Sequence, residues 1–268
     1  MCFPSPLLHS PGAFTALSTD GTPSLLLSFV QGEPADKIIR RGGAEPGKVL
    51  RSIGKAMAEL HKLPFESSSS SPHLRKVEEG GACDLRLHLN GEMLSLLQTS
   101  EHTKEHEFMP FYIRQRELLL QAMAKSGIPH GILHGDPFLD NILCDSSGEV
   151  TGFVDLEDVA VGPCLFDIAC CACACCFGES NSLDLLRLRA LLEGYYSERP
   201  LLPEESDVFV DWMKATMLCN ASWRFKNFNI DHREIEECRN AHIELQSRIL
   251  ELEQPQVVEQ VNSLLGSL

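Results

Sequence analysis

The apolar residues of this chain repeat with two different periods. From residue 49 onward most of them recur every three or four positions, the spacing that places side chains on one face of a helix. This spacing predicts helices over residues 49–60, 111–126, 183–196, 207–225 and 235–252. The larger part of the chain is therefore expected to be helical.

Shorter apolar runs near the N-terminus indicate strands and turns. Residues 25–30 form one such run, which ends at Gly32, and residues 20–23 (DGTP) carry a turn signal. Residues 66–72 (ESSSSSP) are of low complexity, which predicts a flexible surface loop. The β structure is thus expected mainly before the first long helix.

A second β unit is expected in the middle of the chain. The apolar runs 142–144 and 150–154 flank Asp145-Ser146-Ser147-Gly148, which is typical of a hairpin turn. The whole pattern predicts an α+β fold in which a small β portion precedes a mainly helical body that contains one hairpin.

Composition and charge restrict the possible partners. The chain has 268 residues, of which 43% are hydrophobic and 23% charged, the mix of a soluble globular protein. Its net charge of −15 argues against nucleic acid and anionic membranes as partners, because no basic run offsets it. No apolar run approaches the roughly 20 residues of a membrane span, and the first residues lack the pattern of a signal or transit peptide.

Eleven cysteines are present, and five of them lie within residues 170–176. Adjacent cysteines on one buried element are poor disulfide partners, so reduced thiols and a cytoplasmic location are expected. The C-x-x-C spacings of this run allow a zinc or redox site, but no second ligand pair at zinc-finger spacing accompanies them. A buried helix in which cysteine acts as a small hydrophobe is the simpler interpretation.

The residues with the clearest chemistry lie between 131 and 167. His134-Gly135-Asp136 is followed five residues later by Asn141, and Asp155 comes directly after the hairpin. Kinases of the protein-kinase type need a carboxylate that accepts the proton of the attacking hydroxyl, and an asparagine and an aspartate that hold Mg²⁺. Each residue alone could cap a turn or end a strand, but their combination favours a phosphotransferase.

This stretch resembles the aminoglycoside phosphotransferase superfamily, whose catalytic loop is written H-G-D-x-x-x-x-N. The resemblance is closest to the type II homoserine kinases and covers nearly the whole chain. It rests on HGDPFLDNILCDSSGEVTGFVDLEDV and, more weakly, on FPSPLLHSPGAF…LLLSFVQGE, FDIACCACACCF, LLEGYYSERPL and ASWRFKNFNI. It implies a protein-kinase-like fold and an ATP- and Mg²⁺-dependent kinase of threonine biosynthesis that phosphorylates the hydroxyl of homoserine.

The resemblance also implies roles for single residues. Asp136 would be the catalytic base, Asn141 and Asp155 would bind Mg²⁺, and His134 would brace the loop. Asp167 would support that loop from the following helix.

Three further interpretations concern the hinge, Asp167 and His61. The adenine would meet backbone groups of Ser28 to Val30, where the chain passes between lobes. Asp167 could also serve as the N-cap of a helix over residues 168–177, which is compatible with its supporting role. His61 lies on a helix, where polar bracing or packing is favoured over chemistry.

The resemblance divides the chain into residues 1–31, a remnant of the N-terminal lobe with the hinge, and residues 32–268, the helical catalytic lobe. The family's Gly-rich loop, strand lysine and helix glutamate have no match before the hinge, and the first lysine is Lys37. We therefore expect a truncated N-terminal lobe and poor activity of the chain by itself. A catalytically impaired pseudokinase that serves as a binding module is the alternative.

The sequence gives the least information about the substrate that accepts the phosphoryl group. An amino-acid substrate needs an acid for its ammonium group, for which Glu157 and Asp158 are candidates, and a cation for its carboxylate, for which Arg224 and Lys226 are candidates. All four could equally be solvated surface charges. Choline, hydroxylysine and aminosugars are alternative small-molecule substrates for the same chemistry.

Overall fold

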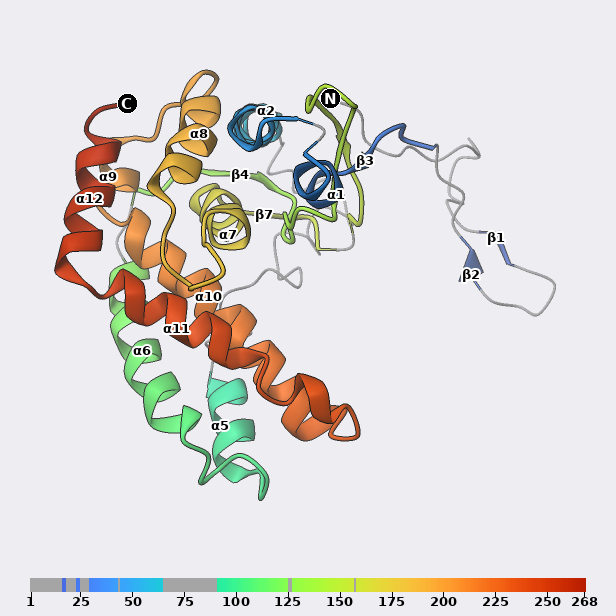
Figure 1. Ribbon diagram of the computed structural model, residues 1–268. Helices are drawn as coiled ribbons and strands as arrows, with labels where there is room; N and C mark the ends of the chain where they lie inside the picture. The colour runs from blue at the N-terminus through green and yellow to red at the C-terminus, as the bar shows by residue number, and fades with distance from the viewer. Residues whose placement is uncertain are drawn as a thin grey trace.

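Helices dominate the architecture (Figure 1). The computed structural model describes residues 16–17, 23–24, 29–42, 44–64, 91–124, 127–156 and 158–268. The α-helices are α1 (Ala35–Arg40), α2 (Pro46–His61), α5 (Gly91–Thr99), α6 (Phe108–Met123), α7 (Leu165–Cys175), α8 (Leu185–Tyr196), α9 (Pro203–Ser206), α10 (Phe209–Lys226), α11 (His242–Leu252) and α12 (Pro255–Leu265). A π-helical turn, η1 (Asn227–Asp231), and a 3₁₀ turn, η2 (Glu236–Cys238), lie between α10 and α11. Within these ranges no helix is long and apolar enough to cross a membrane.

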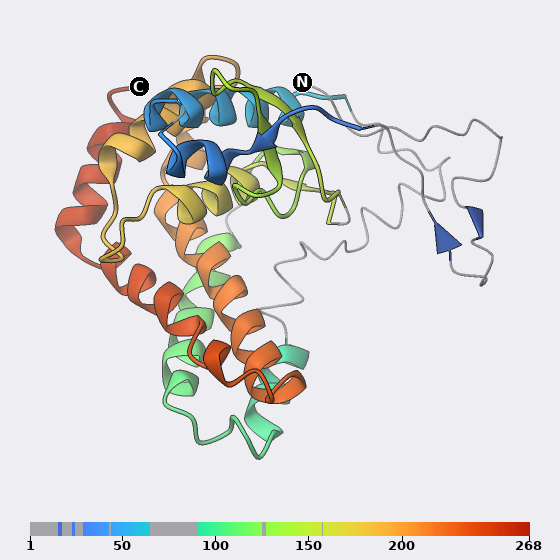
Figure 2. The same ribbon diagram turned by 45° about the vertical axis from the view of Figure 1, so that its right-hand side comes forward.

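Within the described residues the strands are short and form three small antiparallel sheets. They are β1 (Ala16–Leu17), β2 (Pro23–Ser24), β3 (Glu33–Pro34), β4 (His130–Leu133), β5 (Ile142–Cys144), β6 (Val150–Phe153) and β7 (Ala160–Pro163). The sheet orders are β1-β2, β3-β5-β6 and β4-β7. Helices α2, α7 and α8 gather near β4 and β7, whereas α5 and α6 lie at the other end of the molecule (Figures 1 and 2).

The predicted hairpin is confirmed as β5 and β6. Ile142 pairs with Phe153 at its open end. At the turn, the carboxylate of Asp145 accepts backbone N–H groups of Ser147 and Glu149 at 2.8 and 3.1 Å. Gly148 has a φ of 88°, a value that favours glycine, so the turn sequence specifies this geometry.

Two glycines allow α2 and α8 to approach each other closely. A Cβ atom on Gly54 of α2 would lie 1.9 Å from the carbonyl oxygen of Leu191, and one on Gly194 of α8 would lie 1.9 Å from that of Arg51. Any larger side chain would therefore force the two helices apart. This contact fixes the position of the C-terminal end of α2 relative to α8.

Apart from Asp167, helix α7 is apolar around its whole circumference, which is typical of a buried helix. It packs against α10 and also contacts α2 and α8. The five cysteines of residues 170–176 are buried free thiols, and the Sγ of Cys173 donates to the carbonyl oxygen of Met213 in α10 at 3.3 Å. In this helix the cysteines serve as small packing residues.

Some boundaries differ from the prediction. The helix predicted over 111–126 begins at Phe108 and ends at Met123. The helix predicted over 168–177 begins at Leu165, with Cys164 at its N-cap, so the N-cap interpretation of Asp167 is wrong. Pro163 ends β7 directly before this position, and the chain enters the helix earlier than the polar residue suggested.

The helix predicted over 235–252 is interrupted. Only η2 and α11 form there, because side chains from the preceding helices bind the intervening backbone carbonyls. The Nδ2 of Asn229 donates to the carbonyl oxygen of Arg239 at 3.1 Å, and Nη1 of Arg224 donates to that of Ala241 at 3.1 Å. The sequence prediction also did not include α1, α5, α12, β4 and β7.

The N-terminal predictions fall mostly outside the described residues. This holds for residues 25–28 of the predicted strand, for most of the turn at 20–23, and for the loop at 66–72. Phe29 and Val30, which end the predicted strand, have no regular secondary structure.

Candidate functional site: the loop between β4 and β5

The candidate loop crosses from one sheet to another. It follows β4, which pairs with β7, and it ends at β5, which pairs with β6. Because Ile142 is opposite Phe153, the residue before Ile142 and the residue after Phe153 also lie side by side. The backbone N–H of Val154 donates to the carbonyl oxygen of Asn141 at 3.0 Å. The hairpin register therefore brings Asn141 next to the segment that carries Asp155.

The side chain of Asn141 is hydrogen-bonded to Asp136. Its Nδ2 donates to both the backbone oxygen and Oδ2 of Asp136, each at 3.0 Å. Since the amide nitrogen makes both bonds, the amide oxygen Oδ1 remains the atom that can bind a cation. The five-residue spacing noted in the sequence thus corresponds to direct contact between the two side chains.

The ring of His134 joins the two halves of the site. Its Nδ1 accepts the backbone N–H of Asp136 at 3.2 Å, and its Nε2 lies 2.9 Å from the carbonyl oxygen of Val154. A neutral imidazole satisfies both partners, accepting at Nδ1 and donating from Nε2. One buried side chain therefore fixes Asp136 relative to the residue that precedes Asp155.

Asp167 supports the loop from α7. It is completely buried, and its two carboxylate oxygens accept the backbone N–H groups of His134 and Gly135 at 2.6 and 3.0 Å. Gly135 has a φ of 92°, a conformation that strongly favours glycine. These two contacts fix the backbone immediately before Asp136.

Several carboxylates of like charge act on one another in this site. Burial raises the pKa of Asp136 above its usual range, and nearby carboxylates raise it further; these belong to Asp158, Asp140 and Asp155, while His134 acts in the opposite direction. Asp155 itself has a φ of 59°, which costs roughly 1 kcal/mol or more for a residue other than glycine. Clustered like charges and backbone strain are both common at functional sites.

The donor chemistry of this loop fits a hard divalent cation. Carboxylate and amide oxygens are the protein ligands that Mg²⁺ prefers, and a few of them suffice when phosphates complete the coordination. The fit depends on Asn141, because the Asp, Glu, His and Cys side chains within the described ranges form no group of three that could hold a metal by themselves.

The other predicted site residues are placed less completely. Ser28 and Glu157 lie outside the described residues. Val30 is buried, and the adjacent carbonyl oxygen of Gln31 accepts from Oγ1 of Thr151 in β6 at 2.6 Å. The predicted hinge thus leads directly into the hairpin sheet.

The two cations suggested for a substrate carboxylate have other partners. Arg224 forms an ion pair with Glu244 at 3.0 Å, and Lys226 forms one with Asp231. Both lie at the C-terminal end of α10, at the opposite end of the molecule from α2 and α8 (Figures 1 and 2). These contacts favour a structural role for both residues, whereas Asp158 acts electrostatically on Asp136.

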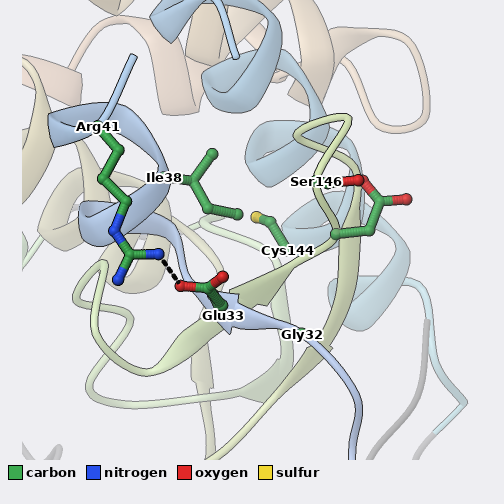
Figure 3. A pocket seen from close by; sticks show the side chains of 7 residues that line it. Gly32, Glu33, Ile38, Arg41, Cys144 and Ser146 are labelled. Carbon is green, nitrogen blue, oxygen red and sulfur yellow. Dashed lines mark hydrogen bonds and ion pairs between the residues drawn. The ribbon is translucent and has the colours of Figure 1, made fainter. Parts of the chain in front are cut away.

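A surface cavity of about 380 Å³ lies at the turn end of the hairpin, away from the loop (Figure 3). Ile38 from α1 and Cys144 from β5 line it together with the exposed ion pair of Arg41 and Glu33, whose charged atoms are 2.5 Å apart. None of Asp136, Asn141 and Asp155 lines this cavity, so it is separate from the candidate site.

Solved structures with a similar fold define the class of protein. A choline/ethanolamine kinase family protein from Mesorhizobium loti has a TM-score of 0.63 at 19% identity, over 98% of this chain and 78% of that one. A microcompartment-associated aminopropanol kinase has a TM-score of 0.64 at 15% identity, over 96% of this chain and 77% of that one. The fold is therefore that of the kinase-like phosphotransferases, as the sequence predicted.

The chain belongs to the phosphotransferase enzyme family, whose profile matches residues 4–201. Among curated relatives, the homoserine kinase of Rhizobium etli strain CFN 42 is 28% identical over an alignment of 211 residues, and the match covers 75% of this chain and 57% of the relative. The homoserine kinase of Caulobacter sp. strain K31 is 30% identical over an alignment of 180 residues, and the match covers 60% of this chain and 55% of that protein. The chain thus spans little more than half the length of these relatives.

Sequence reasoning did not identify every residue around the loop. Buried Tyr195 and Glu205 and partly exposed Arg199 form a polar group that reaches Asp167 through His61. They lie in an ordinary helix and the segment after it, and no spacing in the sequence connects them to the loop. Only the close packing of α2 on α8 brings them together.

Proposed function

We propose that this chain carries the catalytic and metal-binding centre of an ATP- and Mg²⁺-dependent phosphotransferase that acts on the hydroxyl of homoserine. The observation that carries the proposal is the double contact of the Asn141 amide with Asp136, at 3.0 Å, beside the segment of Asp155. This is the combination of base and metal ligands that phosphoryl transfer requires. Family membership supports the reaction class.

In this proposal Asp136 orients the acceptor hydroxyl and accepts its proton. The backbone bonds to Asp167 and His134 hold that carboxylate still, so that little reorganisation is needed during transfer. Asn141, through Oδ1, and Asp155 are the residues that would hold Mg²⁺. When bound, the cation neutralises charge on the nucleotide phosphates.

The acidic surroundings support an acceptor with a positive charge. The carboxylates of Asp158, Asp140 and Asp155 act on Asp136, and together they would attract an ammonium group near the reacting hydroxyl. Homoserine has both groups, and the names of the curated relatives favour it. Asp158 is the described residue best placed for the ammonium, with Glu157 as its neighbour in sequence.

The assignment of domains belongs to the same proposal. Residues 1–31 would contribute the end of an N-terminal lobe and the hinge, and residues 32–268 the catalytic lobe, with β3 beginning at Glu33. The free thiols of α7 support a reducing, cytoplasmic environment.

The test is a phosphotransfer assay with Mg-ATP and a panel of acceptors: homoserine, choline, ethanolamine, hydroxylysine and an aminoglycoside. It uses the chain itself and a chimera that joins to it the part of the Rhizobium etli relative outside the match. We expect homoserine to give the highest kcat/KM. Transfer to another acceptor alone would overturn the substrate, and no transfer to any acceptor by either protein would overturn the reaction.

A further inference from the structure

A line of hydrogen-bonded side chains runs from α9 to the candidate loop. Glu205 accepts from Nη2 of Arg199 at 2.9 Å, and Nη1 of Arg199 donates to the hydroxyl of Tyr195 at 3.0 Å. That hydroxyl lies 2.7 Å from Nδ1 of His61, whose Nε2 lies 3.2 Å from Oδ2 of Asp167. Asp167 in turn accepts the two backbone N–H groups before the catalytic aspartate.

The direction of each bond follows from the chemistry of the groups. A guanidinium only donates, so the oxygen of Tyr195 accepts from Arg199. Burial raises the pKa of Tyr195, which therefore remains a phenol and donates its proton to Nδ1 of His61. The ring then carries its own proton on Nε2 and donates it to Asp167. Tyr195 and Arg199 together thus select one tautomer and one ring orientation of His61.

Packing alone does not require the members of this line to be polar. Tyr195, His61, Asp167 and Glu205 are all buried, and well-packed apolar side chains of similar volume would often be at least as stabilising. The neighbouring contact of α2 with α8 already holds the helices together through Gly54 and Gly194. The polar line ends at the backbone that positions Asp136. A further constraint there would hold the loop in place for phosphoryl transfer.

We infer that Tyr195 and Arg199 are positioning residues for phosphoryl transfer, acting through His61 and Asp167 on the loop that bears Asp136. The inference rests on the proposed function of that loop. It predicts that loss of the Tyr195 hydroxyl loosens the loop even though the residue touches neither substrate nor loop.

The first test measures amide hydrogen exchange in residues 1–268 with Tyr195→Phe. The substitution keeps the ring but leaves Nδ1 of His61 without its donor. We expect the amides of His134 and Gly135 to exchange about tenfold faster, relative to the amides of α10, which corresponds to the loss of about one hydrogen bond. Equal exchange in the wild type and the variant would overturn the inference.

Tyr196→Phe is the matched control. Tyr196 is the next residue of the same helix, is half-buried, and its hydroxyl is hydrogen-bonded to Ser206, whereas that of Tyr195 is bonded to His61. This variant loses a comparable hydroxyl contact, so we expect a similar shift in melting temperature without faster exchange at His134 and Gly135. The same acceleration in both variants would show that Tyr195 is merely structural and would overturn the inference.

The second test uses the form of the protein that is active in the phosphotransfer assay. Tyr195→Phe is expected to lower kcat about tenfold with KM for Mg-ATP unchanged, whereas Tyr196→Phe leaves both constants unchanged. An unchanged kcat in Tyr195→Phe contradicts the inference. If the wild type transfers no phosphate, the proposed function fails, and the exchange experiment still decides whether the line controls the loop.

Discussion

The loop between β4 and β5 and the contact between α2 and α8 are built in opposite ways. In the helix pair, Gly54 and Gly194 bring backbone against backbone, and few polar side chains are needed. In the loop, hydrogen bonds hold Asp136 to Asn141 and to the ring of His134, and the carboxylate of buried Asp167 holds the backbone just before them. The first arrangement provides stability, and the second fixes side-chain positions at an energetic cost.

The difference is instructive because the two regions are connected. His61 is the last residue of α2, and Tyr195 follows Gly194 in α8, so the tight helix contact brings these two interior members of the polar line together. Substitutions in the loop should therefore affect activity more than stability, and substitutions in the helix contact should do the reverse.

The largest effect is expected for Asp136→Asn in the active form of the protein. Loss of a base typically lowers turnover by roughly 10²–10⁴-fold, while Mg-nucleotide binding should remain largely intact. The measurement is kcat with Mg-ATP and homoserine, with Asp145→Asn on the exposed hairpin turn as a control. A variant that kept more than about a tenth of wild-type turnover would rule out this role.

Asp167→Ala should have the largest effect on stability among single changes near the loop. It leaves the N–H groups of His134 and Gly135 and the Nε2 of His61 without a partner in a buried environment. At roughly 1–3 kcal/mol for each unsatisfied group, we expect the free energy of unfolding to fall by roughly 3 kcal/mol or more. Urea unfolding measures this, and a loss below about 1 kcal/mol would contradict the proposed support.

Gly194→Ala and Gly54→Ala test the close contact between α2 and α8. Each new Cβ would meet a backbone carbonyl that cannot move without moving its helix. We expect a loss of roughly 1–3 kcal/mol, the usual cost of overpacking. Gly91→Ala, at the start of α5, is the control because nothing lies within 4 Å of its Cβ position. Equal melting temperatures for Gly194→Ala and Gly91→Ala would refute the close approach.

Asp155→Gly should give the smallest effect on stability and one of opposite sign. Glycine adopts a φ of 59° without steric cost, so relief of strain should stabilise the fold by up to about 1 kcal/mol. Asp155→Ala keeps the strain and provides the comparison. A lower melting temperature for Asp155→Gly than for Asp155→Ala would contradict backbone strain at this position.

The sequence predicted much of this architecture where local pattern alone determines structure. Helix α2 has strong apolar periodicity, and the hairpin has an unambiguous turn. Strands β4 and β7 were missed because they are short and pair with each other across the intervening loop and hairpin, with no turn between them to signal the pairing. The break before α11 could not be predicted, since side chains distant in sequence bind its carbonyls.

The candidate site shows the same division. The contact between Asp136 and Asn141 follows from their spacing within one loop, and the hairpin brings Asp155 beside them. In the line from Glu205 to His61, the contacts of Arg199 with Tyr195 and Glu205 are local, but only tertiary packing brings Tyr195 to His61. No local pattern therefore signals the connection to the loop. Residues that act through other residues are thus the ones that sequence patterns reveal least.

The most direct test of the central claim is a titration of ATP into the active form of the protein with and without Mg²⁺. We expect Asn141→Ala and Asp155→Ala to remove most of the Mg²⁺-dependent gain in affinity, because each takes away a proposed oxygen ligand. Asp145→Ala, ten residues before Asp155 on the same hairpin, should leave that gain unchanged. If all three variants kept the full dependence on Mg²⁺, the loop between β4 and β5 would not be the metal and nucleotide site.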